Sequence, residues 1–463
     1  MARSKEMDLT TGNPFRSLLK FAIPVILGNL FQLFYTLADS VIVGKTLGAD
    51  SLAAVGSTSI IIYFVFCFIN GFTGGFGICL GQRCGAKDEK GMRKSIAVST
   101  LLSIAFTVVL TLVCCLLAHQ ILSWMQIPED ISGEAYDYMF VVLLGTGATV
   151  FYNMISNMLR ALGDSKTPLY FLVFSSVLNI VMDLWMVAGL GLGVFGAALA
   201  TLIAQGISAV FSLLIFFNRM RRYKSRFNWF DRQELHSMLR IAVPSVLQQS
   251  TVSIGMMIVQ AVVNPFGTQA LAGYAATMRV ENVFSLIFVS IGNAVSPYVS
   301  QNLGAKKIGR LKKGYHAALV LDLCFAVLAF IVIETLHTQI SSLFLGKDGT
   351  ALAYQVSGDY MRWLGFFFIF MGIKMATDGV LRGLGIMRPF LIANMVNLAI
   401  RLSVALILAP RFGIAFVWLA VPAGWLANFL ISYVALRKSW PDDKMAFAAI
   451  EDGAAVFIEK YCK

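Results

Sequence analysis

The sequence predicts an all-α, polytopic membrane protein with twelve transmembrane helices. Of its 463 residues, 58% are hydrophobic and only 13% are charged, which is too apolar for a protein with an ordinary water-facing surface. The apolar residues form runs of about 20 to 30, long enough to cross a hydrocarbon core of about 30 Å as helices. An internal repeat divides the runs six and six, so we expect two six-helix lobes.

Loop residues between the apolar runs define the expected spans in chain order. The runs cover 15–43, 52–80, 95–118, 134–160, 168–188, 195–218, 238–263, 270–299, 315–337, 354–381, 389–409 and 414–436. The longest polar connection separates the sixth run from the seventh. We accordingly expect an N-terminal lobe at 1–218, a cytoplasmic linker at 219–237, a C-terminal lobe at 238–436 and a cytoplasmic tail at 437–463.

The basic residues predict the orientation. About 30 of the 37 Lys and Arg lie in the two terminal segments and in the loops at 82–94, 160–167, 219–240, 300–314 and 382–388. Lys and Arg are enriched on the cytoplasmic side of membrane proteins. Both termini are therefore expected in the cytoplasm of a cell whose plasma membrane holds the protein. The net charge of +12 then reflects topology, so we expect contacts with membrane lipid and none with nucleic acid. We also expect the protein to function as a monomer.

The repeat is visible in two motifs. Residues 82–87 (QRCGAK) match 301–306 (QNLGAK), and residues 159–163 (LRALG) match 381–385 (LRGLG). Six spans is an even number, so both copies enter the membrane with the same orientation. Their pseudo-twofold axis should lie along the membrane normal, with a cavity between the lobes. Such duplication is common in transporters.

A buried carboxylate in the first span is the strongest functional signal. An ionisable residue inside a membrane helix is a functional-site hypothesis by default. Gln32, Tyr35 and Asp39 share one helical face, as do Asn179 and Asp183 in the fifth span. Both acids lie about 8 Å inside the outer helix ends by residue count.

Two carboxyl groups at equal depth suggest one shared pocket. Desolvation and mutual repulsion would then favour proton uptake by the pair near neutral pH, and a sodium ion at Asp39 and Asp183 is the other candidate. Alternatively, each acid separately bonds a neighbouring helix or lines a water-filled vestibule. In the alignment of the two halves, Asp183 corresponds to Arg401, and Asp39 corresponds to Ile258 or Val259. The acidic pair therefore belongs to the first lobe alone.

Other residues within the spans receive weaker interpretations. Glu281 is expected to face the cavity and attract a cationic substrate. Arg279 lies two residues from Glu281, and side chains two apart on a helix do not face each other, so we expect no salt bridge between them. Asp378 is expected to pair with Lys374 one turn earlier. Pro24 removes one backbone hydrogen bond from the first helix and is a candidate hinge. Candidate greasy residues of the substrate cavity are Met256, Met257, Phe284 and Phe288.

Taken in order, these features resemble the multidrug and toxic compound extrusion family of bacterial exporters, in its archaeal-type and DNA-damage-inducible-type branch. The resemblance covers about residues 10–436. It rests on Pro24 and Asp39, on 48–56 (GADSLAAVG), on the two repeated motifs, and on Asn179 with Asp183.

The resemblance implies an antiporter that expels small amphipathic, usually cationic compounds in exchange for protons or sodium. It implies no enzyme activity and no cofactor beyond the coupling ion. Residues matching Asp39 and Asp183 bind that ion in similar proteins, with polar neighbours that match Gln32, Tyr35, Asn179 and Thr201, joined by Asn153 or Asn157. The sodium-coupled branch carries further acids in the seventh and tenth helices. The seventh span here has Gln248, Gln249 and Gln260 instead, which favours the first-lobe site.

Other functions fit the sequence less well. A flippase for a lipid-linked saccharide shares this fold, but such proteins often have more spans or a strongly basic central cavity. An enzyme or a channel would need a nucleophile motif, a nucleotide loop, a His cluster or a selectivity-filter repeat, and the sequence has none of these. The four His are dispersed, and the seven Cys show no paired spacing.

Overall fold

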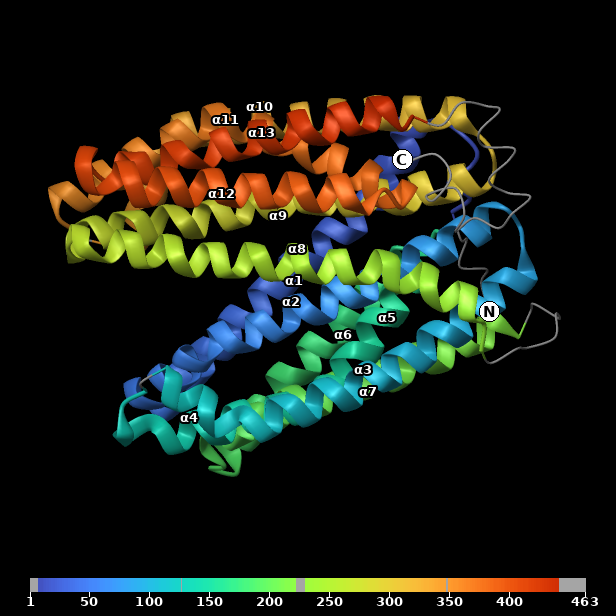
Figure 1. The fold of residues 1–463 in the computed structure, drawn as a ribbon. Coiled ribbons are helices and arrows are strands. Elements are labelled where there is room, and N and C mark those ends of the chain that lie inside the picture. The colour runs from blue at the N-terminus through green and yellow to red at the C-terminus, as the bar shows by residue number, and fades with distance from the viewer. Residues whose placement is uncertain (1–6, 126, 222–229, 347–348, 441–463) are drawn as a thin grey trace. The chain divides into compact units, whose positions relative to one another are not determined.

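The computed structural model describes residues 7–125, 127–221, 230–346 and 349–440. Within these ranges the ordered elements are helices (Figure 1). Residues 222–229 of the predicted linker and residues 441–463 of the predicted tail lie outside the described residues. In chain order the helices are α1 (Pro14–Leu47), α2 (Ala49–Gly85), α3 (Glu89–Trp124), α4 (Glu129–Leu144), α5 (Thr146–Ala161), α6 (Lys166–Asp183), the π-helical turn η1 (Leu184–Gly189), α7 (Gly193–Met220), α8 (Arg232–Val263), the 3₁₀ turn η2 (Asn264–Phe266), α9 (Thr268–Gly304), α10 (Ile308–Leu345), α11 (Ala351–Leu384), α12 (Met387–Phe412) and α13 (Ala415–Lys438).

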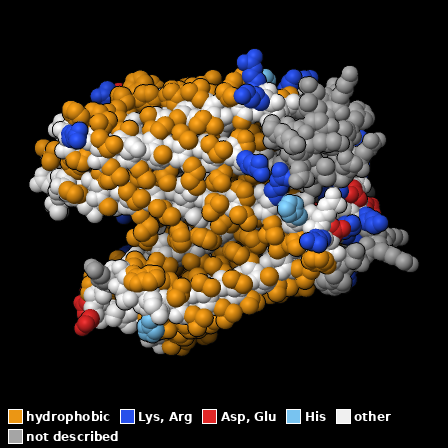
Figure 2. Space-filling view, viewed as in Figure 1, with side chains coloured by type: hydrophobic (Ala, Val, Ile, Leu, Met, Phe, Trp, Pro, Cys, Tyr) orange, Lys and Arg blue, Asp and Glu red, His pale blue; other side chains and the backbone are white. Residues whose placement is uncertain are grey.

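Twelve membrane crossings account for these helices. Eleven are long and apolar enough to cross a bilayer singly, by length and composition. The twelfth crossing is the pair α4 and α5, which bend by 44° at the break around Gly145 and together fill the fourth expected span, 134–160. The all-α class and the number of spans are thus confirmed. Figure 2 shows hydrophobic side chains along the visible faces of the helices, with most Lys and Arg toward one end.

The chain folds into two compact units. The first contains Met7 and Leu27–Val246, and the second contains Asp8–Ile26 and the residues from Leu247 onward. The boundaries fall inside α1 and α8, two residues after Pro24 in one helix and two residues after Pro244 in the other. The beginning of each of these helices therefore packs with the unit that does not contain its end.

Both repeated motifs are helix ends. In 82–87 and 301–306 the final lysines, Lys87 and Lys306, adopt left-handed φ angles of 55° and 59°. The amide of the residue after each lysine donates to a carbonyl five residues back, a helix-terminating geometry. In 159–163 and 381–385 the final glycines, Gly163 and Gly385, have φ angles of 88° and 77° and close the helix in the same way. The repeated motifs therefore mark the ends of helices, next to the basic loops of each unit.

Ion pairs join loops and helices at the basic end of the first unit. Arg219 Nη1 lies 2.5 Å from Asp164 Oδ2, which also accepts a hydrogen bond from Thr167 Oγ1. Burial alone would raise the pKa of Asp164, but the hydrogen bonds from Thr167 and the Arg219 guanidinium outweigh it and lower the pKa below its usual value. Glu234 accepts from Arg83 at 3.0 Å, which fixes the start of α8 to this unit.

Close helix packing defines the core of the second unit. α9 and α11 approach at small residues, and a Cβ added at Gly379 on α11 would lie 2.5 Å from the Gly292 carbonyl oxygen on α9. Elsewhere between the same two helices, Phe288 and Phe368 are fully buried with ring centroids 5.7 Å apart. Backbone atoms cannot move away from a new methyl group as a flexible side chain can. The contact therefore requires glycine.

We expect Gly379→Ala to lower the free energy of unfolding by about 1–3 kcal/mol, because overpacking forces backbone shifts. The midpoint of thermal unfolding in detergent measures this change. Gly309 is the matched control, since it is a helical glycine of the same unit with no atom within 4 Å of an added Cβ. Gly309→Ala should leave the midpoint unchanged or raise it through helix propensity. Equal midpoints for the two variants would contradict the account of this contact.

Candidate functional site

Asp39 and Asp183 come together inside the first unit. Asp39 lies in α1, two turns before the helix ends, and Asp183 is the last residue of α6. Immediately after Asp183 the chain widens into the π-helical turn η1, a distortion that often occurs at functional sites. Asp183 is completely buried and Asp39 is 8% exposed, and the two carboxyl groups lie close enough for their charges to interact.

Neither carboxyl group is neutralised by the protein. Among the described residues, no donor reaches Asp39 Oδ1 or either carboxylate oxygen of Asp183. The side-chain oxygen of buried Asn179, one turn before Asp183, also accepts no hydrogen bond there. Buried charges are normally paired or bound to a cation, and an unpaired one is very costly. A proton or a cation bound at the pair would remove this cost.

Two tyrosines surround the pair. Tyr35 lies one turn before Asp39 on α1, and its side chain is close to Gln205 of α7. Tyr138 of α4 is buried close to both carboxyl groups and to Tyr35. Sequence reasoning missed Tyr138 and Gln205. Gln205 lies one turn after Thr201 on α7, and this i, i+4 spacing was a signal that could have found it.

The predicted amide and hydroxyl neighbours form two short chains. Asn179 Nδ2 donates to Thr201 Oγ1 at 3.2 Å, which joins α6 to α7 beside Asp183. Thr149 of α5 donates to Gln205 at 2.6 Å, and the backbone carbonyl of Thr149 accepts from Asn153 at 2.8 Å. Polar side chains of α5 and α6 are thus each hydrogen-bonded to α7 in the first unit.

Asn157 and Gln32 have different surroundings. Asn157 lies one turn beyond Asn153, where it donates to Thr73 at 3.2 Å and accepts from Arg160 at 3.4 Å. Asn153 thus lies one turn from Thr149, which bonds to Gln205, whereas Asn157 bonds toward the basic end. Which of the two joins the ion site stays a prediction. Gln32 lies on α1 nearly two turns before Asp39, and its backbone carbonyl accepts from Thr36 at 2.9 Å.

The cluster suits a small hard cation. Two carboxyl groups and the Asn179 amide offer oxygen atoms alone, which is the ligand type that sodium and other hard ions prefer and that a proton also satisfies. No group of three or more His, Cys, Asp and Glu capable of holding a metal occurs in the described part of the chain. The arrangement offers ligand atoms for one small cation.

In the second unit the acidic residues have other partners. Glu281 is buried in α9 and accepts a 2.5 Å hydrogen bond from Tyr360 of α11, with Arg401 of α12 close enough to act on its charge. Tyr360 stacks between the rings of Tyr274 and Trp418, at centroid distances of 5.6 and 5.1 Å. Glu281 is thus tied into a packed core.

Two further acids lie in the second unit. Asp378 pairs with Lys374 at 3.1 Å one turn away on α11, which confirms the sequence interpretation, and it also accepts from Ser432 at 3.1 Å. Asp322 of α10 is 1% exposed, and neither of its oxygens has a hydrogen-bond partner among the described residues.

The four hydrophobic residues predicted to line the substrate cavity lie in different environments. Phe288 is part of the α9 and α11 core, and Phe284 packs on the same Phe368 ring at 5.5 Å. Met256 is half-buried and Met257 is exposed, one residue apart on α8. Their assignment to a substrate cavity stays a prediction.

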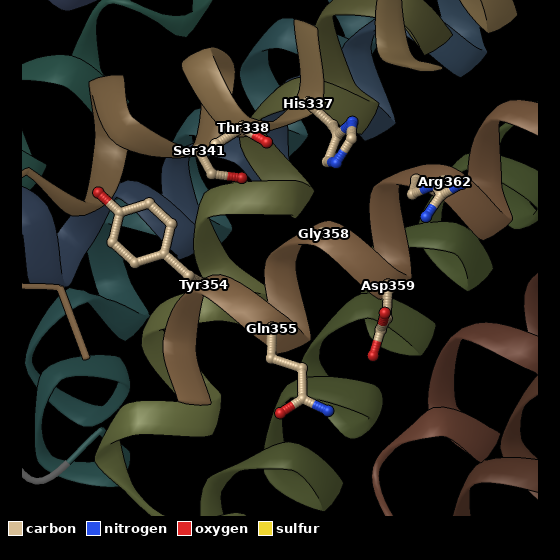
Figure 3. A pocket seen from close by; sticks show the side chains of 8 residues that line it. All are labelled: His337, Thr338, Ser341, Tyr354, Gln355, Gly358, Asp359 and Arg362. Carbon is tan, nitrogen blue, oxygen red and sulfur yellow. The ribbon is translucent and has the colours of Figure 1, made fainter. Parts of the chain in front are cut away.

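A separate polar pocket of about 300 Å³ lies between α10 and α11 (Figure 3). Its walls carry His337, Thr338 and Ser341 from α10, and Tyr354, Gln355, Gly358, Asp359 and Arg362 from α11. None of the predicted site residues lines this pocket. Arg362 is engaged there by Glu334, with Nη2 to Oε1 at 2.6 Å.

Comparisons with known proteins agree on one family. The MatE family model matches residues 24–185 and 244–407. The probable multidrug resistance protein YpnP of Bacillus subtilis (strain 168) is 29% identical over 401 residues, which are 85% of this chain and 88% of YpnP. The multidrug export protein MepA of Staphylococcus haemolyticus (strain JCSC1435) is 23% identical over 445 residues, covering 94% of this chain and 97% of MepA.

The fold also has a solved counterpart. The structure of a MOP superfamily transporter from Pyrococcus furiosus Vc1 (DSM3638) superposes with a TM-score of 0.86 at 24% identity. The match covers 97% of this chain and all of that one.

Proposed function

Because this chain belongs to the MatE family, the multidrug and toxic compound extrusion transporters, we propose that it is a multidrug efflux transporter driven by cation antiport. Inward movement of a proton or a sodium ion drives the export of small amphipathic compounds. Relatives that span nearly the whole chain are named multidrug resistance or multidrug export proteins, which supports the export of several compounds. Members of this family are membrane transporters and not enzymes.

One observation carries the ion coupling: the buried Asp39 and Asp183 carboxyl groups, which lie together with no donor to three of their oxygens. A pair of this kind holds one cation tightly when closed and releases it once water enters. Antiport needs this difference, since an ion drives a conformational change only as far as it binds the two states unequally. Cation binding at the pair would favour the state that releases the exported compound.

The orientation belongs to the same proposal. The basic ends of both units face the cytoplasm, because Lys and Arg cluster there. The Asp39 and Asp183 carboxyl groups then lie nearer the outer surface and take up the cation from outside, as inward cation flow requires. Pro24 and Pro244 lie beside the points where α1 and α8 pass between units, which supports them as bend points for the change of access.

Everted membrane vesicles test this function directly. With an imposed gradient of protons or of sodium, high inside the vesicle, a fluorescent amphipathic dye should accumulate inside, and collapsing that gradient should stop it. The gradient that supports uptake identifies the coupling ion. Dye uptake of equal rate with both gradients collapsed would contradict cation antiport.

A further inference from the structure

Arg279 is a charged side chain that the described structure leaves without a partner. It lies on α9, eleven residues after the helix begins at Thr268, which is about 16 Å along the axis. Its side chain is exposed, and within the described residues it forms no hydrogen bond, ion pair or ring contact. Glu281, two residues away, is buried on another face and bonded to Tyr360.

Arg362 lies at the corresponding position of another helix in the same unit and does have a partner. It lies eleven residues after the start of α11 at Ala351, the same number as for Arg279 in α9. Arg362 is held by Glu334 through two guanidinium nitrogens, Nε at 3.1 Å and Nη2 at 2.6 Å. At the same position from the helix start, the unit neutralises one arginine and leaves the other uncompensated.

The face that carries Arg279 is made of small and polar side chains. Ala272, Ala275, Arg279 and Asn282 are all exposed and follow one another at intervals of three, four and three residues, so they form one stripe along α9. Other exposed helix faces carry large apolar side chains: on α3, Val109 and Leu116 are 60% and 75% exposed. A guanidinium in hydrocarbon is costly, and buried arginines of membrane helices face the bundle interior or an aqueous cavity.

The arginine also distinguishes the two repeats. The shift of 219 residues that aligns the two halves places Ala272 on Ala53 and Arg279 on Ile60, and Ala53 and Ile60 are exposed on α2 in turn. The small residue is kept at the matching position while the charge is present only in the second half.

We propose that Arg279 binds an acidic group of the exported molecule, a carboxylate, phosphate or sulfonate, so that organic anions and zwitterions are substrates. This rests on the export function proposed above and adds the substrate class. The planar guanidinium offers two parallel donors that match such a group, and the Asn282 amide, three residues on, is placed to add another. Asp39 and Asp183 carry the coupling ion in the other unit, so substrate anion and driving cation have separate sites.

The test compares charge variants in proteoliposomes of zwitterionic lipid, using carboxyfluorescein as the anionic probe and ethidium as the cationic one. Arg279→Gln should raise the KM for carboxyfluorescein by about tenfold or more and leave ethidium transport unchanged or faster. Arg279→Lys keeps the charge and should recover most of the loss. Arg362→Gln, at the matched position, should not change the ratio between the two probes.

The outcomes separate the possible failures. Unchanged carboxyfluorescein kinetics in Arg279→Gln, or a wild type that does not move carboxyfluorescein, would overturn the proposal. A loss for both probes that grows with added anionic lipid would assign Arg279 to a lipid phosphate and overturn it as well. Asp39→Asn should stop both probes. If it does not, the ion-coupling proposal fails while the result for Arg279 still stands.

Discussion

Asp39→Asn is expected to abolish gradient-driven export while the protein remains folded in the membrane. The substitution keeps the shape of the side chain and removes the charge that binds the coupling ion. It also removes the repulsion between two buried acids, so it should not destabilise the first unit. Initial rates of dye transport in vesicles, normalised to the amount of folded protein, measure the effect. We expect a loss of at least about 100-fold, as for removal of a charged group that must be present.

Two companion variants make this result specific. Asp183→Asn should cause the same loss, and the double variant should be no worse than either single one, because groups that act as one unit are not additive. Asp359→Asn is the control, since Asp359 is an exposed acid in the second unit. It should transport at the wild-type rate. Export by Asp39→Asn at more than half the wild-type rate would contradict the assignment.

Lys374→Met is expected to cost the protein about 3–5 kcal/mol of unfolding free energy. Lys374 and Asp378 are both nearly fully buried, and the substitution would leave the Asp378 carboxylate with its hydrogen bonds and without its directly bonded counter-charge, while the Arg382 guanidinium acts on it from farther away. Removing one partner of a buried ion pair strands the other charge, which costs more than the pair itself contributes. The midpoint of thermal unfolding in detergent should fall clearly.

A double substitution separates a stranded charge from lost packing. Lys374→Met combined with Asp378→Asn removes both charges and should recover most of the lost stability. If the double variant is as unstable as the single one, the side-chain shape of Lys374 and not its charge maintains the site.

Much of the fold follows from the sequence because hydrocarbon imposes strict rules. A backbone in lipid must be helical or in a closed barrel, so apolar length alone indicates the spans. The bend at Gly145 was not predicted, since α4 and α5 form one continuous apolar run. The division of α1 and α8 between units also depends on packing contacts such as that of Gly71, whose added Cβ would lie 2.7 Å from Val246 Cα.

The candidate site was only partly predictable. Equal depth from the helix ends suggested that Asp39 and Asp183 lie together, and depth is readable because the helix rise is constant. Tyr138 could not be found in this way, because tyrosines are common near membrane surfaces and nothing in the spacing of α4 distinguishes this one. Glu281 is a different case. Its sequence position is compatible with a cavity wall, and only the structure shows the Tyr360 hydroxyl bonded to it.

The most direct test of the central claim, that Asp39 and Asp183 hold the coupling ion, is ion release on substrate binding. Purified protein in weakly buffered detergent is titrated with a transported compound, while a pH indicator reports protons and bound ²²Na⁺ reports sodium. The wild type should release about one cation per molecule bound, since coupled sites exclude one another's ligands. The Asp39→Asn/Asp183→Asn variant should bind the compound and release none. Release of the same amount by that variant would contradict the account.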